Sequence, residues 1–233
     1  MPIGVILNVL AVVLGGFLGS IAGNRLPERL KQGMTTIFGF CAMSIGISSI
    51  VLMKNLAAVI FSVIAGSFIG ILLNIDGGIR AGTARLLNRL HFDTGMDEPL
   101  MVTAIVLFCA SSTGIYGSLI SGITGDHSIL IAKSILDFFT AMIFACRLKK
   151  ATMLIGIPQL VILMLLFFSA RLILPLTNDS MIADFKACGG IILLATGFTI
   201  MKVREVPVAN MIPAMVLVFP VSALWTQVIQ PLL

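Results

Sequence analysis

The chain has 233 residues, of which 58% are apolar and only 11% are charged, and its mean hydropathy is +1.12. A soluble domain of this length would need far more polar surface than these residues supply, so the composition excludes a water-soluble globular protein. The net charge of +5 is spread over short loops instead of one basic patch, which argues against a nucleic-acid partner.

Long uncharged runs recur along the chain, and they predict an all-α, polytopic membrane helix bundle surrounded by a lipid bilayer. The first charged residue, Arg25, follows the first apolar run, so this run is expected to be a retained helix and not a cleaved signal peptide. Eight membrane spans are expected, over residues 2–22, 34–53, 56–74, 99–122, 127–147, 151–173, 188–202 and 209–230.

Alternate connections between these spans carry most of the positive charge. Eleven of the fifteen Lys and Arg residues fall on one side if the number of spans is even. Because basic residues concentrate on the cytoplasmic side of membrane proteins, both termini are predicted to face the outer side.

Small residues recur every fourth position in the first and third spans. Gly15 and Gly19, and Gly66 and Gly70, form stripes that allow helices to approach closely. Their expected role is packing, and a homodimer seam is the alternative. Asn8, a polar residue in the first span, is expected to bond across helices.

The connection over residues 75–98 contains the arginines Arg80, Arg85 and Arg89. Their spacing is compatible with an interfacial helix on the inner leaflet. A solvated loop with a single helical turn is the equally weighted alternative.

The fourth span changes composition halfway. Its apolar part, Leu100 to Ala110, has eleven residues, which cover roughly 16 Å of a hydrocarbon core about 30 Å thick. The remainder, SSTGIYGSLISGITG, predicts a broken helix or a re-entrant turn whose backbone meets a ligand. A continuous helix packed through small residues is the alternative. Candidate substrate-binding residues here are Ser111, Ser112, Thr113, Gly114, Tyr116 and Gly117.

The fifth span carries two opposite charges, Lys133 and Asp137, which are four residues apart and therefore on one helix face. With a helix start near Ser128, Asp137 lies roughly 14 Å deep. Ionisable residues inside a membrane indicate a functional site, so both residues and the neighbouring Ser134 are candidates for substrate binding. A purely structural ion pair is the alternative. Asp126 is expected to cap this helix.

The last three spans hold further polar and helix-breaking residues. Gln159 in the sixth span is expected to bond across helices, like Asn8. In the eighth span Pro213 follows Asn210, so a kinked or discontinuous helix is expected there. Asn210 is a further candidate for substrate binding and Pro213 for a structural role.

A constant offset of 151 residues relates one pair of polar residues and two pairs of glycines in the two halves of the chain. It pairs Asn8 with Gln159, and it pairs Gly39 and Gly46 with two later glycines, Gly190 and Gly197. Spans one to three would then correspond to spans six to eight with inverted topology, as in many secondary transporters. The predicted organisation is one membrane domain, 1–233, with repeats at 1–74 and 151–233, a cytoplasmic connection at 75–98 and a central pair of helices at 99–150.

The central run G-D-x-S-x-L-x-x-K-S-x-x-D starts at Gly125 and ends at Asp137. It resembles the signature of the YdfK/YqgA family of uncharacterised bacterial membrane proteins, and the likeness extends over the whole chain. Ser121 departs from that pattern, in which an acidic residue stands, and this weakens the idea of a second acidic site in the fourth span. The resemblance implies a bacterial inner-membrane location and supplies no substrate.

Two functions are compatible with these features. The first is a small-solute transporter with a polar mid-membrane site, for which a proton is a candidate coupling ion. The second is a non-transporting scaffold or regulatory module in which Lys133 and Asp137 hold the bundle together. The chain lacks the sequence motifs of soluble enzymes, so neither an enzyme, a cofactor nor a metal is expected, and a homodimer is the expected assembly.

Overall fold

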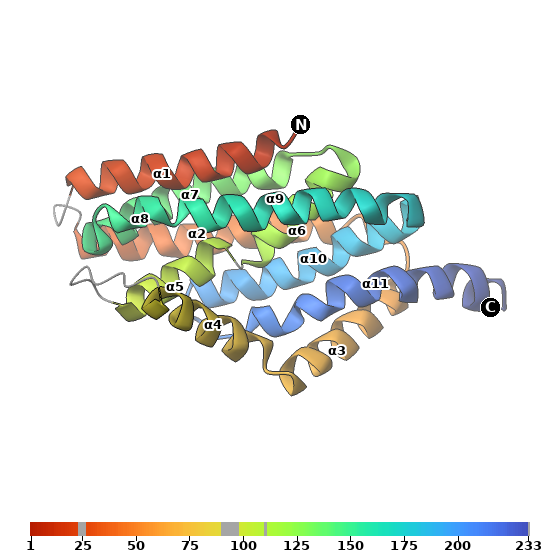
Figure 1. Ribbon diagram of the computed structural model, residues 1–233. Helices are drawn as coiled ribbons and strands as arrows, with labels where there is room; N and C mark the ends of the chain where they lie inside the picture. Colours follow the sequence, from red (N-terminus) through yellow and green to blue (C-terminus); the bar gives the residue numbers. More distant parts are fainter. Residues whose placement is uncertain (23–26, 90–97, 110, 233) are drawn as a thin grey trace. The chain divides into compact units, whose positions relative to one another are not determined.

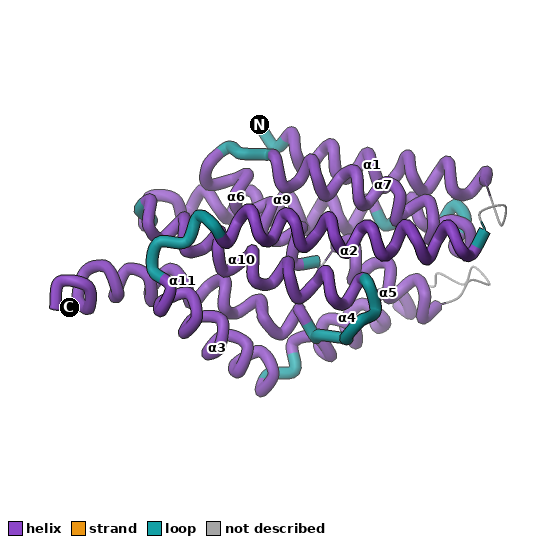
Figure 2. The backbone as a smooth tube through the Cα atoms, turned by 180° about the vertical axis from the view of Figure 1, so that it is seen from behind, coloured by secondary structure: helices purple, strands orange, loops and turns teal. Residues whose placement is uncertain are grey.

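The computed structural model describes residues 1–22, 27–89, 98–109 and 111–232. These residues form helices joined by short connections, and no strand occurs among them (Figure 2). The predicted all-α fold is confirmed. The α-helices are α1 (Ile3–Ala22), α2 (Glu28–Ile50), α3 (Leu56–Leu72), α4 (Ile75–Arg89), α5 (Glu98–Cys109), α6 (Ser112–Thr124), α7 (Ser128–Leu148), α8 (Ala151–Leu154), α9 (Gly156–Ile173), α10 (Asp179–Ile200) and α11 (Ile212–Leu224).

Within the described ranges, seven helices are long and apolar enough to cross a membrane, and an eighth span results when α3 and α4 are counted together as one broken span. The predicted eight spans all have a counterpart under this count. The seventh begins earlier than expected, at Asp179 instead of 188. Asn178 caps it by accepting a hydrogen bond from the Met181 N–H at 2.9 Å, so α10 continues through charged residues that the hydropathy pattern assigned to a loop.

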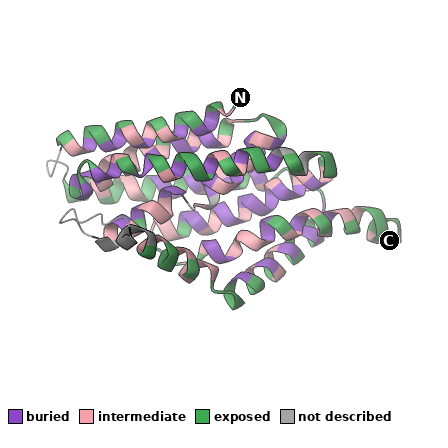
Figure 3. Cartoon of the chain, in the orientation of Figure 1, coloured by how far each residue is buried: buried purple, intermediate pink, exposed green. Residues whose placement is uncertain are grey.

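Helices α1, α3 and α9 each have a buried side and an exposed side (Figure 3), and the exposed side is apolar. On α1, Val5 and Val12 are fully buried, whereas Leu7, Leu10 and Leu14 are exposed. Exposed leucines at helical spacing are expected where a helix faces lipid, because the bilayer core is itself apolar.

The chain forms two compact units, the first made of Met1–Thr35 and Gly77–Leu172 and the second of Thr36–Asp76 and Ile173–Leu233. In the first unit α1 lies along α7 (Figures 1 and 2). A Cβ atom placed on Gly19 would lie 2.8 Å from the Ala145 Cβ, and one placed on Gly15 would clash with the Phe138 carbonyl oxygen. The predicted stripe of Gly15 and Gly19 therefore packs α1 against α7.

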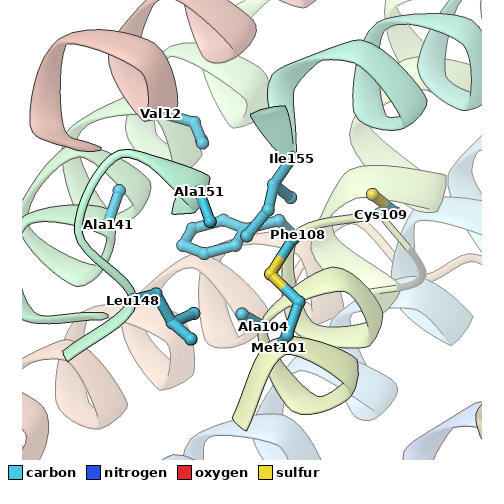
Figure 4. Close-up of a cluster of buried hydrophobic side chains, with 9 residues drawn as sticks. All are labelled: Val12, Met101, Ala104, Phe108, Cys109, Ala141, Leu148, Ala151 and Ile155. Carbon is cyan, nitrogen blue, oxygen red and sulfur yellow. The ribbon is translucent and has the colours of Figure 1, made fainter. Parts of the chain in front are cut away.

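A hydrophobic cluster fills the first unit beside these helices (Figure 4). The Phe108 ring lies at its centre and meets the Phe144 ring edge-on at a centroid distance of 6.0 Å. The cluster joins α1, α5, α7 and α8, and its members are Val12, Met101, Ala104, Phe108, Cys109, Ala141, Leu148, Ala151 and Ile155.

In the second unit α2 crosses α10 through two pairs of glycines. A Cβ on Gly46 would lie 2.7 Å from the Gly190 carbonyl oxygen, and one on Gly39 would lie 2.9 Å from that of Gly197. Such distances are too short for a side chain, so the helices touch backbone to backbone.

The other predicted stripe also packs inside the second unit. A Cβ on Gly66 would lie 2.7 Å from the Ala214 Cβ, and Gly70 faces the backbone of Asn210. Both stripes therefore pack against helices of the same chain, so neither provides a contact surface for the predicted homodimer.

Two helices of the second unit are interrupted. The helical path breaks after α3, where Asn74 has a positive φ of 46°, and the first N–H groups of α4 include that of Asp76, which donates to the Asn210 side-chain oxygen at 2.8 Å. The eighth span runs as one helical segment from Val208 to Ile229, so the predicted kink or discontinuity amounts to changes of helix type: a 3₁₀ turn (Val208–Met211) precedes α11, and a π turn (Trp225–Ile229) follows it. Pro213 lies in the first turn of α11, where its missing N–H costs no helical hydrogen bond.

Candidate functional site: a buried ion pair beside a helix break

The two charges of α7 form an ion pair: the Lys133 ammonium donates to Asp137 Oδ2. Lys133 is the sixth and Asp137 the tenth residue of this 21-residue helix, and their side chains are only 3% and 10% exposed, respectively. Burial of either charge alone would cost several kcal/mol, and pairing offsets most of that cost.

Two amide side chains from other helices complete the cluster. Asn8 of α1 donates from Nδ2 to Asp137 Oδ2 at 2.8 Å, and Gln159 of α9 donates from Nε2 to the Asn8 Oδ1 at 2.8 Å. The Gln159 Nε2 also lies 3.4 Å from Asp137 Oδ2. Asn8, Lys133, Asp137 and Gln159 are called the polar cluster below. Asn8 and Gln159 do bond across helices, but they do so at the ion pair and not at a separate packing contact.

The predicted break in the fourth span lies next to this cluster. Helix α5 ends at Cys109 and α6 begins at Ser112; Ala110 lies outside the described residues. Ser111 has an extended conformation (φ −67°, ψ 140°), and its hydroxyl caps α6 by accepting from the Gly114 N–H at 3.2 Å. The predicted broken helix is confirmed.

Both ends of the break approach the polar cluster. The carbonyl oxygen of Phe108, in the last turn of α5, lies 3.5 Å from the Gln159 Nε2. A Cβ on Gly114, in the first turn of α6, would lie 3.1 Å from the Lys133 Cε. Since the carbonyls at a helix end lack intrahelical partners, the break supplies a polar oxygen where an unbroken helix would supply none.

Two oxygen atoms of the polar cluster remain without a hydrogen-bond partner among the described residues. Gln159 is fully buried and its Oε1 accepts nothing. The three hydrogen bonds to Asp137 all end on Oδ2, which leaves its Oδ1 free. A buried acceptor without a donor is costly, so the cluster can accept a hydrogen-bond donor or a cation.

The other sequence candidates in the first unit lie in α6 and α7. Thr113 and Tyr116 are buried, and Gly117 packs against Leu130, with a Cβ–Cδ2 separation of 3.0 Å for an added Cβ. The Ser134 hydroxyl donates to the Leu130 carbonyl of its own helix at 2.6 Å, so it is not directed at the ion pair. The side chain of Ser112 lies outside the described part of the structure.

Two candidates lie away from the cluster. Asn210 belongs to the second unit, where its side-chain oxygen binds the Asp76 N–H, as described above. Asp126 is exposed before α7, and its Oδ1 accepts from the Ser128 N–H at 2.9 Å and from the Ser128 hydroxyl at 2.6 Å, which is a capping arrangement.

The sequence interpretation missed a second buried carboxylate, that of Asp184 in α10. Its Oδ1 accepts from the backbone N–H groups of Lys54 and Asn55, each at 2.9 Å. Its Oδ2 accepts from the Asn55 side chain at 2.8 Å and from the Ser222 hydroxyl at 2.6 Å. Both oxygens of this carboxylate are occupied by neutral donors, so it joins α10 to α11 and to the start of α3.

A sequence signal for Asp184 exists in the cap of α10. Asn178 is followed by Asp179 before an apolar pattern, which is typical of a helix start. Extending the seventh span to that cap would have placed Asp184 inside the helix.

Comparison with known proteins gives two clear relatives. The chain is 48% identical over 233 residues to the "Uncharacterized protein YqgA" of Escherichia coli, covering 97% of this chain and 98% of that protein. It is 23% identical over 223 residues to the "Uncharacterized membrane protein YdfK" of Bacillus subtilis, covering 92% and 93% of the two chains. No solved structure matches the chain. Residues 3–223 match the family described as "Protein of unknown function (DUF554)". With a family match over nearly its whole length and a relative that is named a membrane protein, this chain belongs to the DUF554 family of membrane proteins.

Proposed function

We propose that this membrane protein is a small-solute transporter whose binding site is the polar cluster. The observation that carries the proposal is a buried Lys–Asp pair within an apolar helix, next to the break between α5 and α6. In membrane proteins, ionisable side chains of this kind mark pathways, and discontinuous helices offer their free backbone groups to ligands.

The geometry supports a site that can bind both negatively charged groups and hydrogen-bond donors. Lys133 lies by the first turn of α6, whose N–H groups favour negative charge, and Asp137 with Gln159 presents free acceptors. An anionic solute group can take the place of the Asp137 carboxylate beside Lys133, and a proton taken up by Asp137 would then keep the net charge of the site constant.

An inverted repeat is part of this proposal. Under the 151-residue offset Gly39 is equivalent to Gly190 and Gly46 to Gly197. The contacts are Gly39 with Gly197 and Gly46 with Gly190, so each glycine meets the equivalent of the other. This reciprocal pattern is what a two-fold axis produces, and it supports repeats of opposite orientation. Asn8 and Gln159, equivalent under the same offset, bind each other.

The proposed location is the bacterial inner membrane with both termini on the outer side. The support is the alternation of basic connections along the sequence, together with the even number of spans obtained when α3 and α4 count as one.

Uptake into proteoliposomes tests the proposal. Purified full-length chain is reconstituted and given radiolabelled amino acids, small carboxylates, sugars and polyols, with wild type compared with Asp137→Asn. We expect uptake of at least one solute above that of empty vesicles, and a loss of roughly tenfold or more in Asp137→Asn. Glu28→Gln, at an exposed ion pair with Lys31, is the matched charge-removal control and should transport normally.

The second candidate function is a membrane scaffold or regulatory module. It is favoured by the way Lys133, Asn8 and Gln159 already satisfy Asp137 Oδ2 in a nearly closed interior. For a scaffold, the charge-swapped variant Lys133→Asp with Asp137→Lys should fold and function normally. No uptake by the wild type, together with tolerance of the swap, would reject the transporter in favour of the scaffold.

A further inference from the structure

A groove with apolar walls lies between the first turns of α2 and the second half of α7, within the first unit. It is partly open and measures about 250 Å³. Pockets for drug-sized ligands measure about 300–1,000 Å³, so this groove is of a size for part of a chain molecule and not for a whole compact solute. Its lining residues are Leu30, Lys31, Met34, Phe139, Met142 and Ile143.

Lys31 brings a positive charge to the rim of the groove. Its side chain is only 16% exposed, and its ammonium donates to Glu28 Oε1 at 2.7 Å. The Glu28 side chain, at the start of α2, is 76% exposed. Long basic side chains commonly cover an apolar surface with their methylene groups and hold the charge at its edge, and Lys31 does so here.

A second cation continues the apolar wall on α7. Phe139, Ile143 and Arg147 follow one another at intervals of four residues and therefore share one helix face. Arg147 is exposed in the last turn of α7. The face that lines the groove thus leads to a guanidinium group at the end of the helix.

Both cations belong to the same end of the first unit. Helix α1 runs parallel to α7, since a Cβ on Gly4 would meet Leu130 and one on Gly19 would meet the backbone of Met142. Helix α2 begins six residues after α1 ends, and its first turns line the groove together with the second half of α7. The start of α2 and the end of α7 therefore lie on one side, which the proposed topology assigns to the cytoplasm.

We propose that this groove binds an anionic phospholipid of the surrounding membrane, with part of an acyl chain along its walls and the phosphate between Lys31 and Arg147. The inference goes beyond the proposed function and does not depend on solute transport.

The chemistry of the groove favours this occupant. Its apolar walls offer no compensation for a buried polar solute, whereas an acyl chain needs none. Basic pockets between membrane helices on the cytoplasmic side are suited to phosphate head groups. The charges of Glu28, Lys31 and Arg147 sum to +1, which one phosphodiester neutralises. When the phosphate takes the place of Glu28 beside Lys31, the exposed Glu28 carboxylate can be hydrated by water.

Lipid binding to purified, delipidated full-length chain in detergent tests the inference. Phosphatidylglycerol and phosphatidylcholine with the same two oleoyl chains are added separately, native mass spectrometry counts the bound lipids, and the melting temperature is followed in parallel. We expect one saturable phosphatidylglycerol site per chain, with roughly tenfold higher affinity than for phosphatidylcholine, and a rise in melting temperature on binding. Inorganic phosphate, which lacks the acyl chains, should have no effect.

Two changes at one ion pair separate head-group binding from the stability of the pair. Lys31→Gln should lower the preference for phosphatidylglycerol by about fivefold, the worth of one basic residue near an anionic head group. Glu28→Gln breaks the same ion pair but should keep or increase the preference, because it removes a competing negative charge. Arg147→Gln should act like Lys31→Gln, and Lys54→Gln, at an exposed lysine of the second unit, is the charge-removal control.

A further pair of variants tests the groove itself. Ile143→Trp fills the groove and should lose binding of both lipids. Ile135→Trp is the same change at an exposed position of α7 outside the groove, and it should bind as the wild type does. Leu30→Trp narrows the groove from α2 at an exposed position and keeps the test valid if Ile143→Trp does not fold.

The inference is overturned if the wild type binds both lipids equally, if Lys31→Gln and Glu28→Gln change the preference in the same direction, or if the groove variants bind as Ile135→Trp does. An equal response to inorganic phosphate would assign the two cations to a free anion instead. Lipid-free pairs of chains that Ile143→Trp separates would mean that a second copy of the chain covers the groove. None of these measurements involves solute flux, so a failure here leaves the proposed function standing, and absent uptake leaves the lipid site standing.

Discussion

At the scale of single residues, the stability of α7 depends on how its two charges are compensated. Lys133 precedes Asp137 by four residues, which is the weaker orientation for a helical ion pair, and both are buried. The pair is stabilised by contacts that the helix does not supply itself, since Asn8 and Gln159 come from α1 and α9.

Removing one partner should therefore be more harmful than removing both. We expect Lys133→Met or Asp137→Leu alone to lower the free energy of unfolding by about 3–5 kcal/mol, because each leaves an uncompensated buried charge. The double variant should cost much less than the sum. Equilibrium unfolding in mixed detergent micelles measures all three.

The pair of Lys31 with Glu28, at 2.7 Å, is the control for this comparison, because the Glu28 side chain is 76% exposed. Glu28→Gln should change the free energy of unfolding by less than about 1 kcal/mol, as is usual for surface pairs. Single variants of Lys133 and Asp137 as mild as this control would show that the ion pair is not needed for folding.

At the scale of helices, the distance to the neighbouring helix decides which glycines cannot accept a larger side chain. On the same helix α2, Gly46 touches the backbone of α10, whereas Gly33 has no atom within 4 Å of the position its Cβ would take. The two positions therefore separate helix propensity from packing.

We expect Gly46→Ala to lower the free energy of unfolding by about 1–3 kcal/mol, because the added methyl forces α2 and α10 apart. Gly33→Ala should raise it by roughly 0.5–1 kcal/mol, because alanine is the better helix former and nothing obstructs it. Thermal unfolding of the two variants side by side gives the sign of each effect. Equal effects of the same sign would contradict the backbone contact between these helices.

At the scale of the whole molecule, the number of spans sets the side on which each connection lies. Seven described helices are long and apolar enough to cross a membrane, and α3 with α4 would add an eighth crossing if the bent pair counts as one span. The alternation of basic connections is regular only if this eighth crossing is counted.

Reporter fusions test this count. Alkaline phosphatase fused to the C-terminus should be active and a fluorescent protein at the same place dark, because the C-terminus is expected on the outer side. Fusions that end after Lys54 and after Arg89 flank α3 and α4: phosphatase should be active after Lys54, and the fluorescent protein should be bright after Arg89. The same reporter active at both places would mean that α3 and α4 do not cross together.

The amino-acid sequence by itself determined the membrane class, the number of apolar runs, the break in the fourth span and the shared face of Lys133 and Asp137. These are local properties: a run of about 20 apolar residues, a glycine-rich change of composition and a spacing of four residues are read within one helix. The missed start of α10 is local as well, and it failed because hydropathy was given more weight than the capping residue Asn178.

Only the tertiary structure decided which side chains meet. Asn8 bonds to Asp137 over a separation of 129 residues and to Gln159 over 151, and Asp184 reaches Asn55 over 129. No helical periodicity connects residues this far apart in the sequence, because the packing of whole helices determines the partner of a buried polar group. The three oxygen atoms near the Gln159 Nε2 therefore became visible only when α1, α5, α7 and α9 were brought together.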